Sequence, residues 1–243
     1  MKYALLTAAV AGLAAALPQT PRARGGARGL HHSAPNRKNT TFPQYSSNWA
    51  GAVQIGTGFT VVTGTITVPE VYDGNPNSAA SAWVGIDGDT CQSAILQTGV
   101  SFYGDGSFDA WYEWIPDYSY SFSNFGISAR DQIRMTVDAS SKTTGVATLE
   151  NLSTGQKVTH SFKNTPSTLC ETNAEWIVED FEEGSSLVPF ADFGTVTFTN
   201  AYATGSKGKV TPSGSTTMDI KQGSKVLTNC STSGADITCS YTG

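Results

Sequence analysis

The stretch Gln132-Ile-Arg-Met-Thr-Val-Asp138 alternates polar and apolar residues without a break. Successive side chains of a β-strand point to opposite faces, so Ile133, Met135 and Val137 share one face and the polar residues share the other. A strand of this kind packs one face on a core and leaves the other in water, which is typical of antiparallel sheets. The stretch therefore predicts an antiparallel sheet with one wet face.

The same two-residue period recurs along the chain. It is present in three further short runs, at residues 65–68, 157–162 and 195–199. Ser153-Thr154-Gly155 indicates a hairpin loop between two strands, and no run of useful length has helical spacing. The chain after residue 43 is thus predicted to be one all-β domain, 44–243, folded as an antiparallel β-sandwich or barrel.

The first residues are expected to be a secretory signal peptide. Lys2 supplies a positive start, residues 4–13 an apolar stretch, and Ala14-Ala15-Ala16 a small-residue cleavage pattern. The apolar stretch is too short to anchor the chain in a bilayer about 30 Å thick. We therefore expect residues 1–16 to be removed and the protein to be secreted into the extracellular space.

Residues 17–43 are rich in Pro, Gly, Arg and Asn and are expected to be disordered by themselves. All 20 Asp and Glu residues lie after residue 43, whereas six of the 15 Lys and Arg residues lie before it. One interpretation is a basic pro-segment that lies on an acidic body as an intramolecular inhibitor and is released as carboxylates protonate. The alternative is a tail without consequence. A body this acidic is not expected to bind nucleic acid.

The cysteines form an even set in a chain expected to be exported, which predicts two disulfides. No Cys-x-x-Cys pair is present and only one histidine, His160, follows residue 43, so no metal and no other cofactor is expected. Three sequons permit N-linked glycans. The cysteines are Cys91, Cys170, Cys230 and Cys239, and the sequons begin at Asn39, Asn151 and Asn229.

Several catalytic chemistries lack their residues. A Ser-His-Asp triad needs an imidazole, but His31 and His32 lie in the leader, and His160 shares one strand face with Val158 and Phe162. Oxidised cysteines are not nucleophiles. The repeated Asp-Thr-Gly turns that pair two aspartates are absent. Carboxylates and amides on strands are what remain.

Two short runs place polar residues where alternation would put apolar ones. Gln97 shares a face with Ile95. Glu175 and Glu179 share a face with Ile177. A carboxylate on a face built for burial is costly unless it has a use, so these residues are candidates for the chemistry.

In two further runs, aromatic and acidic residues alternate so that they would share one face of a strand. One holds Asp109, Trp111 and Glu113, and the other holds Trp83 and Asp87. Together with the amide and carboxylates above, they describe a wet sheet face with indole walls and a few polar groups, as in a binding site. The alternative is that both Trp residues are core and the carboxylates lie on a solvated outer face.

Five segments resemble the glutamic peptidases (eqolisins), which are secreted acid proteinases known mainly from fungi. They are Ser47-Asn-Trp-Ala-Gly51, Ala82-Trp-Val-Gly-Ile-Asp-Gly-Asp-Thr-Cys91, Ile95-Leu-Gln-Thr-Gly99, Asp109-Ala-Trp-Tyr-Glu-Trp114 and Thr172-Asn-Ala-Glu-Trp-Ile-Val-Glu-Asp-Phe181. The similarity runs from about Tyr45 to the C-terminus. It implies a sandwich of two large antiparallel sheets, a groove across the concave face, and cleavage of polypeptide substrates at acid pH.

The resemblance implies a catalytic dyad of Gln97 and Glu179. Ionised Glu179 would act as general base on a water molecule, and the amide of Gln97 would donate to the developing oxyanion. Glu175 is the competing base. Because four residues of strand separate it from Glu179 by roughly 13 Å, both cannot serve one bond.

The resemblance also implies supporting groups. It assigns substrate binding or support of the dyad to Trp49, Trp83, Asp87, Asp109, Trp111 and Glu113. It pairs Cys91 with Cys170 and Cys230 with Cys239. Some members carry a further cysteine pair in the loop after the Glu strand. Residues 182–187 have none, so we expect that loop to be shorter or more mobile.

Two other functional classes stay open from the residues alone. A β-sandwich glycoside hydrolase would use Glu113 and Glu179 as its two carboxyl groups, and a lectin-like module would bind polysaccharide with the same aromatic residues. For the peptidase we expect a monomer whose partners are polypeptide substrates and its own pro-segment, without nucleic acid or membrane.

Overall fold

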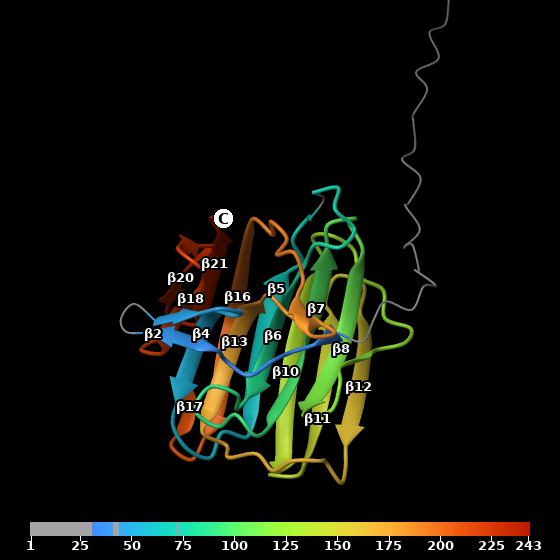
Figure 1. Ribbon diagram of the computed structural model, residues 1–243. Coiled ribbons are helices and arrows are strands. Elements are labelled where there is room, and N and C mark those ends of the chain that lie inside the picture. Colours follow the sequence, from blue (N-terminus) through green and yellow to red (C-terminus); the bar gives the residue numbers. More distant parts are fainter. Residues whose placement is uncertain (1–30, 41–43, 72) are drawn as a thin grey trace, which may run out of the picture.

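The computed structural model describes residues 31–40, 44–71 and 73–243. The predicted signal peptide, 1–16, and residues 17–30 of the predicted pro-segment lie outside the described residues. Figure 1 shows two large sheets stacked face to face. The described residues contain strands and turns but no helix, so none of them forms a helix long and apolar enough to cross a membrane.

The larger sheet has ten strands in the order β2-β3-β18-β4-β13-β6-β7-β8-β9, with β19 paired to β18. Every pairing is antiparallel except that of β18 with β3. The strands are β2 (Lys38–Thr40), β3 (Gln44–Ser46), β4 (Trp49–Ile55), β6 (Ala79–Ile86), β7 (Ile95–Tyr103), β8 (Phe108–Ile115), β9 (Tyr120–Ser121), β13 (Asn173–Glu179), β18 (Thr216–Gln222) and β19 (Lys225–Val226).

The second sheet has eight strands in the order β12-β11-β10-β5-β16-β21-β20, with β17 paired to β16. Its β10 contains the alternating stretch quoted first, and Ile133, Met135 and Val137 are buried there as predicted. Residues 153–155 form the expected turn between β11 and β12. The strands are β5 (Val61–Thr67), β10 (Gln132–Ser141), β11 (Thr144–Asn151), β12 (Gln156–Phe162), β16 (Thr195–Gly205), β17 (Gly208–Val210), β20 (Thr228–Ser233) and β21 (Asp236–Tyr241).

A small third sheet joins the leader to the loop after β13. Its order is β1 (His31–His32), β14 (Glu182–Glu183) and β15 (Ser186–Leu187). The loop at 182–187, which has no cysteine pair, therefore forms a short hairpin that pairs with the leader. Residues 31–40 belong to the segment expected to be disordered by itself, yet they form two strands, of which β1 lies against the hairpin and β2 against β3.

The main core lies between the two large sheets. Alternate residues of β13, namely Ala174, Trp176 and Val178, point into it. The indole of Trp176 also donates a hydrogen bond to the carbonyl of Thr63 on β5 at 2.8 Å. This bond satisfies a buried indole N–H and ties the centre of one sheet to the other.

The opposite face of the ten-stranded sheet carries a second buried cluster. It consists of Trp49, Val53, Trp83, Ile95, Trp111, Ile115, Ile177 and Met218. The central strands of this sheet are thus buried on both faces. Trp83 and Trp111 belong to this second cluster rather than to the core between the sheets, which is the face that the resemblance assigns to the groove.

Both implied disulfides are present. Cys91–Cys170 joins the chain after β6 to the chain just before β13, and Cys230–Cys239 joins β20 to β21. A disulfide that closes a loop as long as the first typically stabilises a domain by about 2–4 kcal/mol. The first bridge also limits where β13 can begin.

The sequons differ in their surroundings. The side chain of Asn151 is buried, and its Nδ2, the atom that a glycan would modify, donates to the carbonyl of Gly126 at 3.0 Å and to Asp131 at 2.8 Å. A glycan on Asn151 is incompatible with these contacts, whereas Asn229 is exposed.

We expect Gly51→Ala to destabilise the protein by about 3 kcal/mol, because it combines strained backbone with a clash. Gly51 has φ +144°, and a Cβ there would lie 2.1 Å from the carbonyl oxygen of Trp176 in β13. Urea unfolding measures the loss. Gly74→Ala is the control, since Gly74 has φ +78° but no described atom within 4 Å of a Cβ, and about 1 kcal/mol is expected. An equal loss of stability in the two variants would contradict a clash at Gly51.

Candidate active site

Cross-strand register places the predicted dyad on one face of the ten-stranded sheet. Glu179 of β13 lies opposite Ser81 of β6, and Gln97 of β7 lies opposite Gly85 of β6. Ser81 and Gly85 differ by an even number of residues, and directly opposite residues in a sheet share a face. Glu179 and Gln97 therefore point to the same side, where the second buried cluster also lies.

Residues His31–Arg37, which we name the strap, lie across this face. The strap begins with β1, which pairs with β14. Farther along, the backbone N–H of Asn36 donates to the carbonyl of Gly88 at 3.1 Å. Arg37 forms an ion pair with Glu182 at 2.7 Å. These contacts hold both ends of the strap against the sheet.

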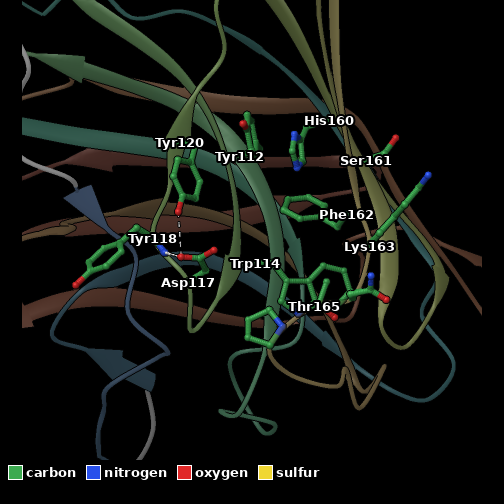
Figure 2. A pocket seen from close by; sticks show the side chains of 12 residues that line it. Tyr112, Trp114, Asp117, Tyr118, Tyr120, His160, Ser161, Phe162, Lys163 and Thr165 are labelled. Carbon is green, nitrogen blue, oxygen red and sulfur yellow. Dashed lines mark hydrogen bonds between the residues drawn. The ribbon is translucent and has the colours of Figure 1, made fainter.

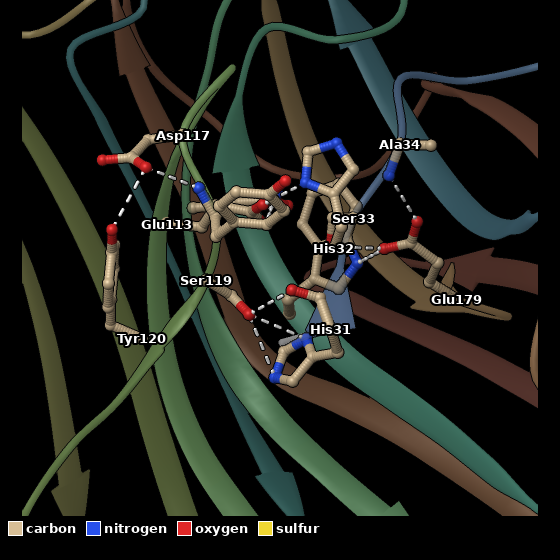
Figure 3. Close-up of polar contacts among 12 residues, drawn as sticks. His31, His32, Ser33, Ala34, Glu113, Asp117, Ser119, Tyr120 and Glu179 are labelled. Atoms are coloured by element: carbon tan, nitrogen blue, oxygen red, sulfur yellow. Dashed lines mark hydrogen bonds and ion pairs between the residues drawn. The ribbon is translucent and has the colours of Figure 1, made fainter. Parts of the chain in front are cut away.

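Both carboxylate oxygens of Glu179 contact the strap (Figure 3). The Ser33 hydroxyl donates to Oε2 at 2.9 Å, and the Ala34 amide donates to Oε1 at 3.2 Å. The indole of Trp83 also donates to Oε2, at 2.8 Å. Burial raises the pKa of Glu179 to about 8, and repulsion from Glu113 adds to this, while the donated hydrogen bonds oppose it.

The amide of Gln97 is held by its cross-strand neighbour. Its Nε2 donates to Oε2 of Glu113 at 2.8 Å, and Glu113 Oε1 accepts from Nδ1 of His32 at 3.0 Å. An amide NH2 has two donors, so one remains for a substrate oxygen. Burial raises the pKa of Glu113, and the contact with His32 opposes this rise.

The dyad thus flanks the strap. His32 contacts the side that carries Gln97 and Glu113, and Ser33, the next residue, contacts Glu179. Consecutive Cα atoms are about 3.8 Å apart, so the two sides of the site face each other across one extended chain. Gln97 and Glu179 are both fully buried, and for Glu179 the strap itself contributes to that burial.

Most of the aromatic and acidic residues predicted from the sequence surround the strap. Trp49 packs edge-to-face on Trp83, with 4.9 Å between ring centroids. Trp111 packs in the same way on His31 at 5.6 Å. An oxygen of Asp109 lies 3.6 Å from Nε2 of His31. These residues form walls for an extended chain.

Asp87 differs from the expectation of a groove-lining side chain. Its carboxylate is buried and accepts four backbone N–H groups, those of residues 170–173, at 2.7 to 3.2 Å. A carboxylate occupied in this way has no lone pair directed to a substrate. Asp87 instead fixes the loop that leads into β13, which parity alone did not reveal because Asp87 follows the end of β6.

Some residues that contact the site were not predicted from the sequence, among them Asn48 and Ser119. Asn48 donates from Nδ2 to Oε1 of Glu179 at 3.4 Å and accepts the backbone N–H of Arg37 at 3.2 Å. Its position in the segment 47–51 was the available signal. Ser119 donates to the carbonyl of His31 at 2.8 Å, and the sequence around Ser119 gave no indication of this contact.

Glu175, the competing base, lies in the same cross-strand row as Gln97. It is fully buried, and neither of its oxygens has a hydrogen-bond partner among the described residues. Burial raises its pKa well above the ordinary value, and repulsion from Asp87 and Asp89 adds to the rise. Glu175 is therefore a neutral acid at the pH at which a Glu base works, and no hydrogen bond joins it to the described strap.

One cluster has the composition of a metal site. Asp87, Cys91 and Cys170 bring their ligand atoms within 4.8 Å of one another. Both Sγ atoms are joined in a disulfide, however, and the carboxylate already accepts backbone amides. Cysteine binds a metal as a thiolate, and a disulfide has none to offer. This cluster therefore does not fit a metal ion.

We expect Glu175→Gln to reduce the loss of stability between pH 4 and pH 7. Because the native pKa of Glu175 is raised, the unfolded state ionises first as the pH rises above about 4.3, and the free energy of unfolding falls until the native group ionises. Below both pKa values the variant and the parent should be alike. Urea unfolding across this pH range measures the effect.

Glu70→Gln is the matched control, since the Glu70 side chain is exposed. It should leave the pH dependence unchanged. A Glu175→Gln variant that loses stability as steeply as the parent would contradict a raised pKa at this position.

Residues 47–241 match the Peptidase A4 family. The chain is 54% identical to aspergillopepsin-2 of Aspergillus niger over 269 residues, covering 96% of this chain and 95% of that protein. It is 47% identical to scytalidopepsin B of Scytalidium lignicola over 228 residues, covering 90% and 87%.

Solved structures agree with this match. The fold resembles scytalido-glutamic peptidase with a transition state analog inhibitor, with a TM-score of 0.78, 48% identity, and coverage of 81% of this chain and 98% of that chain. It also resembles aspergilloglutamic peptidase from Aspergillus niger, with a TM-score of 0.66, 62% identity, and coverage of 68% and 99%. The resemblance noted in the sequence and the β-sandwich fold are both confirmed, and the chain belongs to the Peptidase A4 family, the eqolisins, as a glutamic endopeptidase.

Proposed function

We propose that this protein cleaves polypeptides at acid pH with Glu179 as general base and Gln97 as oxyanion donor. The observation that supports this most is the placement of the two groups on opposite sides of one extended chain, the strap, with Ser33 against Glu179 and His32 against the Gln97–Glu113 pair. A substrate in the place of the strap would have its peptide bond between them.

The proposed cycle moves one proton through Glu179. The ionised carboxylate takes a proton from water, and the resulting hydroxide attacks the carbonyl carbon. The free N–H of the Gln97 amide donates to the oxygen as it becomes negative, while Glu113 holds the other N–H. Protonated Glu179 then gives its proton to the leaving amine, so the carboxylate is restored when the C–N bond breaks.

The proposal requires that the strap leaves before catalysis. With the strap in place, burial raises the pKa of Glu179 to about 8, so the group is protonated in acid and cannot accept a proton. Water in an open groove would return the pKa toward the ordinary value of about 4.3. A base with that pKa is partly ionised at acid pH.

We expect Gln97→Glu and Glu179→Gln each to lower turnover by at least about 10²-fold, the usual loss when an oxyanion donor or a general base is removed. Casein cleavage near pH 3 with pepstatin present is the measurement, because pepstatin fits paired aspartates. Gln132→Glu and Glu70→Gln, at exposed positions, are the matched controls. Full cleavage by either dyad variant would refute the assignment.

We also propose that the chain is secreted as a precursor, with residues 1–16 as signal peptide and residues 17–43 as an inhibitory pro-segment that includes the strap. The Ser33 hydroxyl, 2.9 Å from Oε2 of Glu179, takes the place that an attacking water would need. The Ala34 amide, 3.2 Å from Oε1, lies where the nitrogen of a leaving amine would lie. The strap thus binds as a substrate does while it excludes the nucleophile.

Acid would weaken one part of the proposed inhibition, the contact between His32 and Glu113. The raised pKa of Glu179 under the strap acts in the opposite direction, because a covered Glu179 binds a proton more tightly than an open one. The pKa of His32 is raised by its hydrogen bond to Glu113, and the pKa of Glu113 is raised chiefly by burial. The two side chains attract each other as ions while His32 is protonated and Glu113 is ionised. This attraction is lost as the pH falls through the pKa of Glu113, because the carboxyl is then neutral.

We expect the precursor to be inactive near neutral pH and to convert itself in acid to a form that starts near Gln44 to Ser47. His32→Ala should convert at a pH about one unit higher, since a charge-assisted hydrogen bond is worth about 1.5 kcal/mol. Electrophoresis and N-terminal sequencing across a pH series give the readout. Arg130→Ala, which removes an exposed ion pair, is the control.

A Glu179→Gln precursor should not mature without added protease. Maturation of that variant by itself would refute self-processing. An unchanged conversion pH for His32→Ala would refute the strap contact as the pH-sensitive lock.

A further inference from the structure

A second pocket lies at the edge of the sandwich, away from the dyad. It has a volume of about 410 Å³ and lies where β8 and β9 of the ten-stranded sheet approach β12 of the other (Figure 2). Its walls include six aromatic side chains: Tyr112, Trp114, Tyr118, Tyr120, His160 and Phe162. This volume falls within the range of small-ligand sites.

The rings of the pocket are ordered against one another. Tyr112 and His160 stack with 3.9 Å between centroids and an interplanar angle of 9°. Tyr120 stacks on the same Tyr112 at 6.0 Å and 27°. Tyr118 and Tyr120 are 51% and 44% exposed, which is unusual for large aromatic residues in the described chain. Exposed aromatic residues beside a cavity are typical of a binding site.

One loop separates this pocket from the groove. Residues 116–119 join β8 to β9, and Tyr118 lines the pocket. The ring of Tyr118 also contacts the ring of His32 in the strap at 5.8 Å. Its neighbour Ser119 donates to the carbonyl of His31. The same loop therefore forms a wall of the groove and a wall of the pocket.

We propose that the pocket is an exosite, a second binding site that holds an aromatic side chain of the polypeptide substrate upstream of the segment in the groove. The inference rests on the proposed function. The strap begins beside this loop at His31 and continues past Glu179. A substrate bound in the same direction would therefore have its N-terminal flank next to the pocket.

Aromatic side chains fit the pocket better than sugars or cationic side chains. Asp117, the carboxylate on the rim, already accepts from the backbone N–H of Tyr118 at 2.8 Å and from the hydroxyl of Tyr120 at 3.1 Å. The Thr165 hydroxyl donates to backbone carbonyls. These two polar side chains are therefore already paired, which leaves Ser161 and Asn164 as the other neutral polar side chains of the lining, and Lys163 repels Lys and Arg. Rings instead gain about 0.5–1.5 kcal/mol from each aromatic pair.

The test compares peptides that are identical over the groove segment but carry Trp or Ala at successive positions upstream. With acid-converted enzyme, we expect kcat/KM for the best Trp peptide to exceed that of its Ala partner by about 2–10-fold, the ratio given by 0.5–1.5 kcal/mol. In the variants His160→Ala and Tyr120→Ala, kcat/KM should be about the same for the two peptides. Tyr202→Ala, in β16 of the other sheet, is the aromatic control and should keep the difference between the two peptides.

Each other outcome overturns the inference. No Trp preference at any position, or equal losses on both peptides in the His160→Ala variant, would mean that the pocket does not bind substrate. Competition by xylan or glucan oligosaccharides against the Trp peptide alone would show a sugar site instead. If the parent enzyme cuts neither peptide but its fold is intact, the proposed function has failed, and the exosite falls with it.

Discussion

The register of β13, β6, β7 and β8 is the constraint on which the rest of the structure depends. It places Glu179, Gln97 and Glu113 on one face, although they come from three strands. A slip by one residue would turn every side chain of β13 to the other face and bury Glu179 between the sheets. Asp87, which accepts four amides of the loop before β13, and the Cys91–Cys170 bridge define where that strand begins.

Burial on both faces of the central strands explains the chemistry of this site. Carboxylates here lie among indoles and apolar side chains, where the charged form is poorly solvated. The pKa is raised to about 8 for Glu179 and to about 7 for Asp180, in both cases chiefly by burial. These groups make the folded state more stable in acid than at neutral pH, because the carboxyl groups are then neutral and no charge has to be buried. The same arrangement makes the state of the groove, covered or open, decisive for whether Glu179 acts as a base.

The loop between β8 and β9 links two parts of the surface that would otherwise be independent. Trp111 and Glu113 face the groove, while Tyr112 and Trp114, their neighbours on β8, face the other side and line the pocket. The alternation of one strand thus supplies both sites, and the loop at its end contacts the strap on one side and the pocket on the other. Groove and pocket can therefore be expected to respond to the same polypeptide.

The sequence by itself determined the strand faces. Alternation in Gln132–Asp138 predicted a half-buried strand, and parity together with the family resemblance predicted that Gln97, Glu113, Trp83, Trp111 and Glu179 share a face. It did not predict that Asp87 serves a loop, because residues after a strand end have no parity. It also did not predict order in the strap, whose composition offers little to bury. Only the tertiary structure decided the role of Asp87 and the order of the strap. The hydrogen bonds that hold the strap and the loop before β13 come from carboxylates and backbone groups distant in sequence, and such partners leave no local sequence pattern.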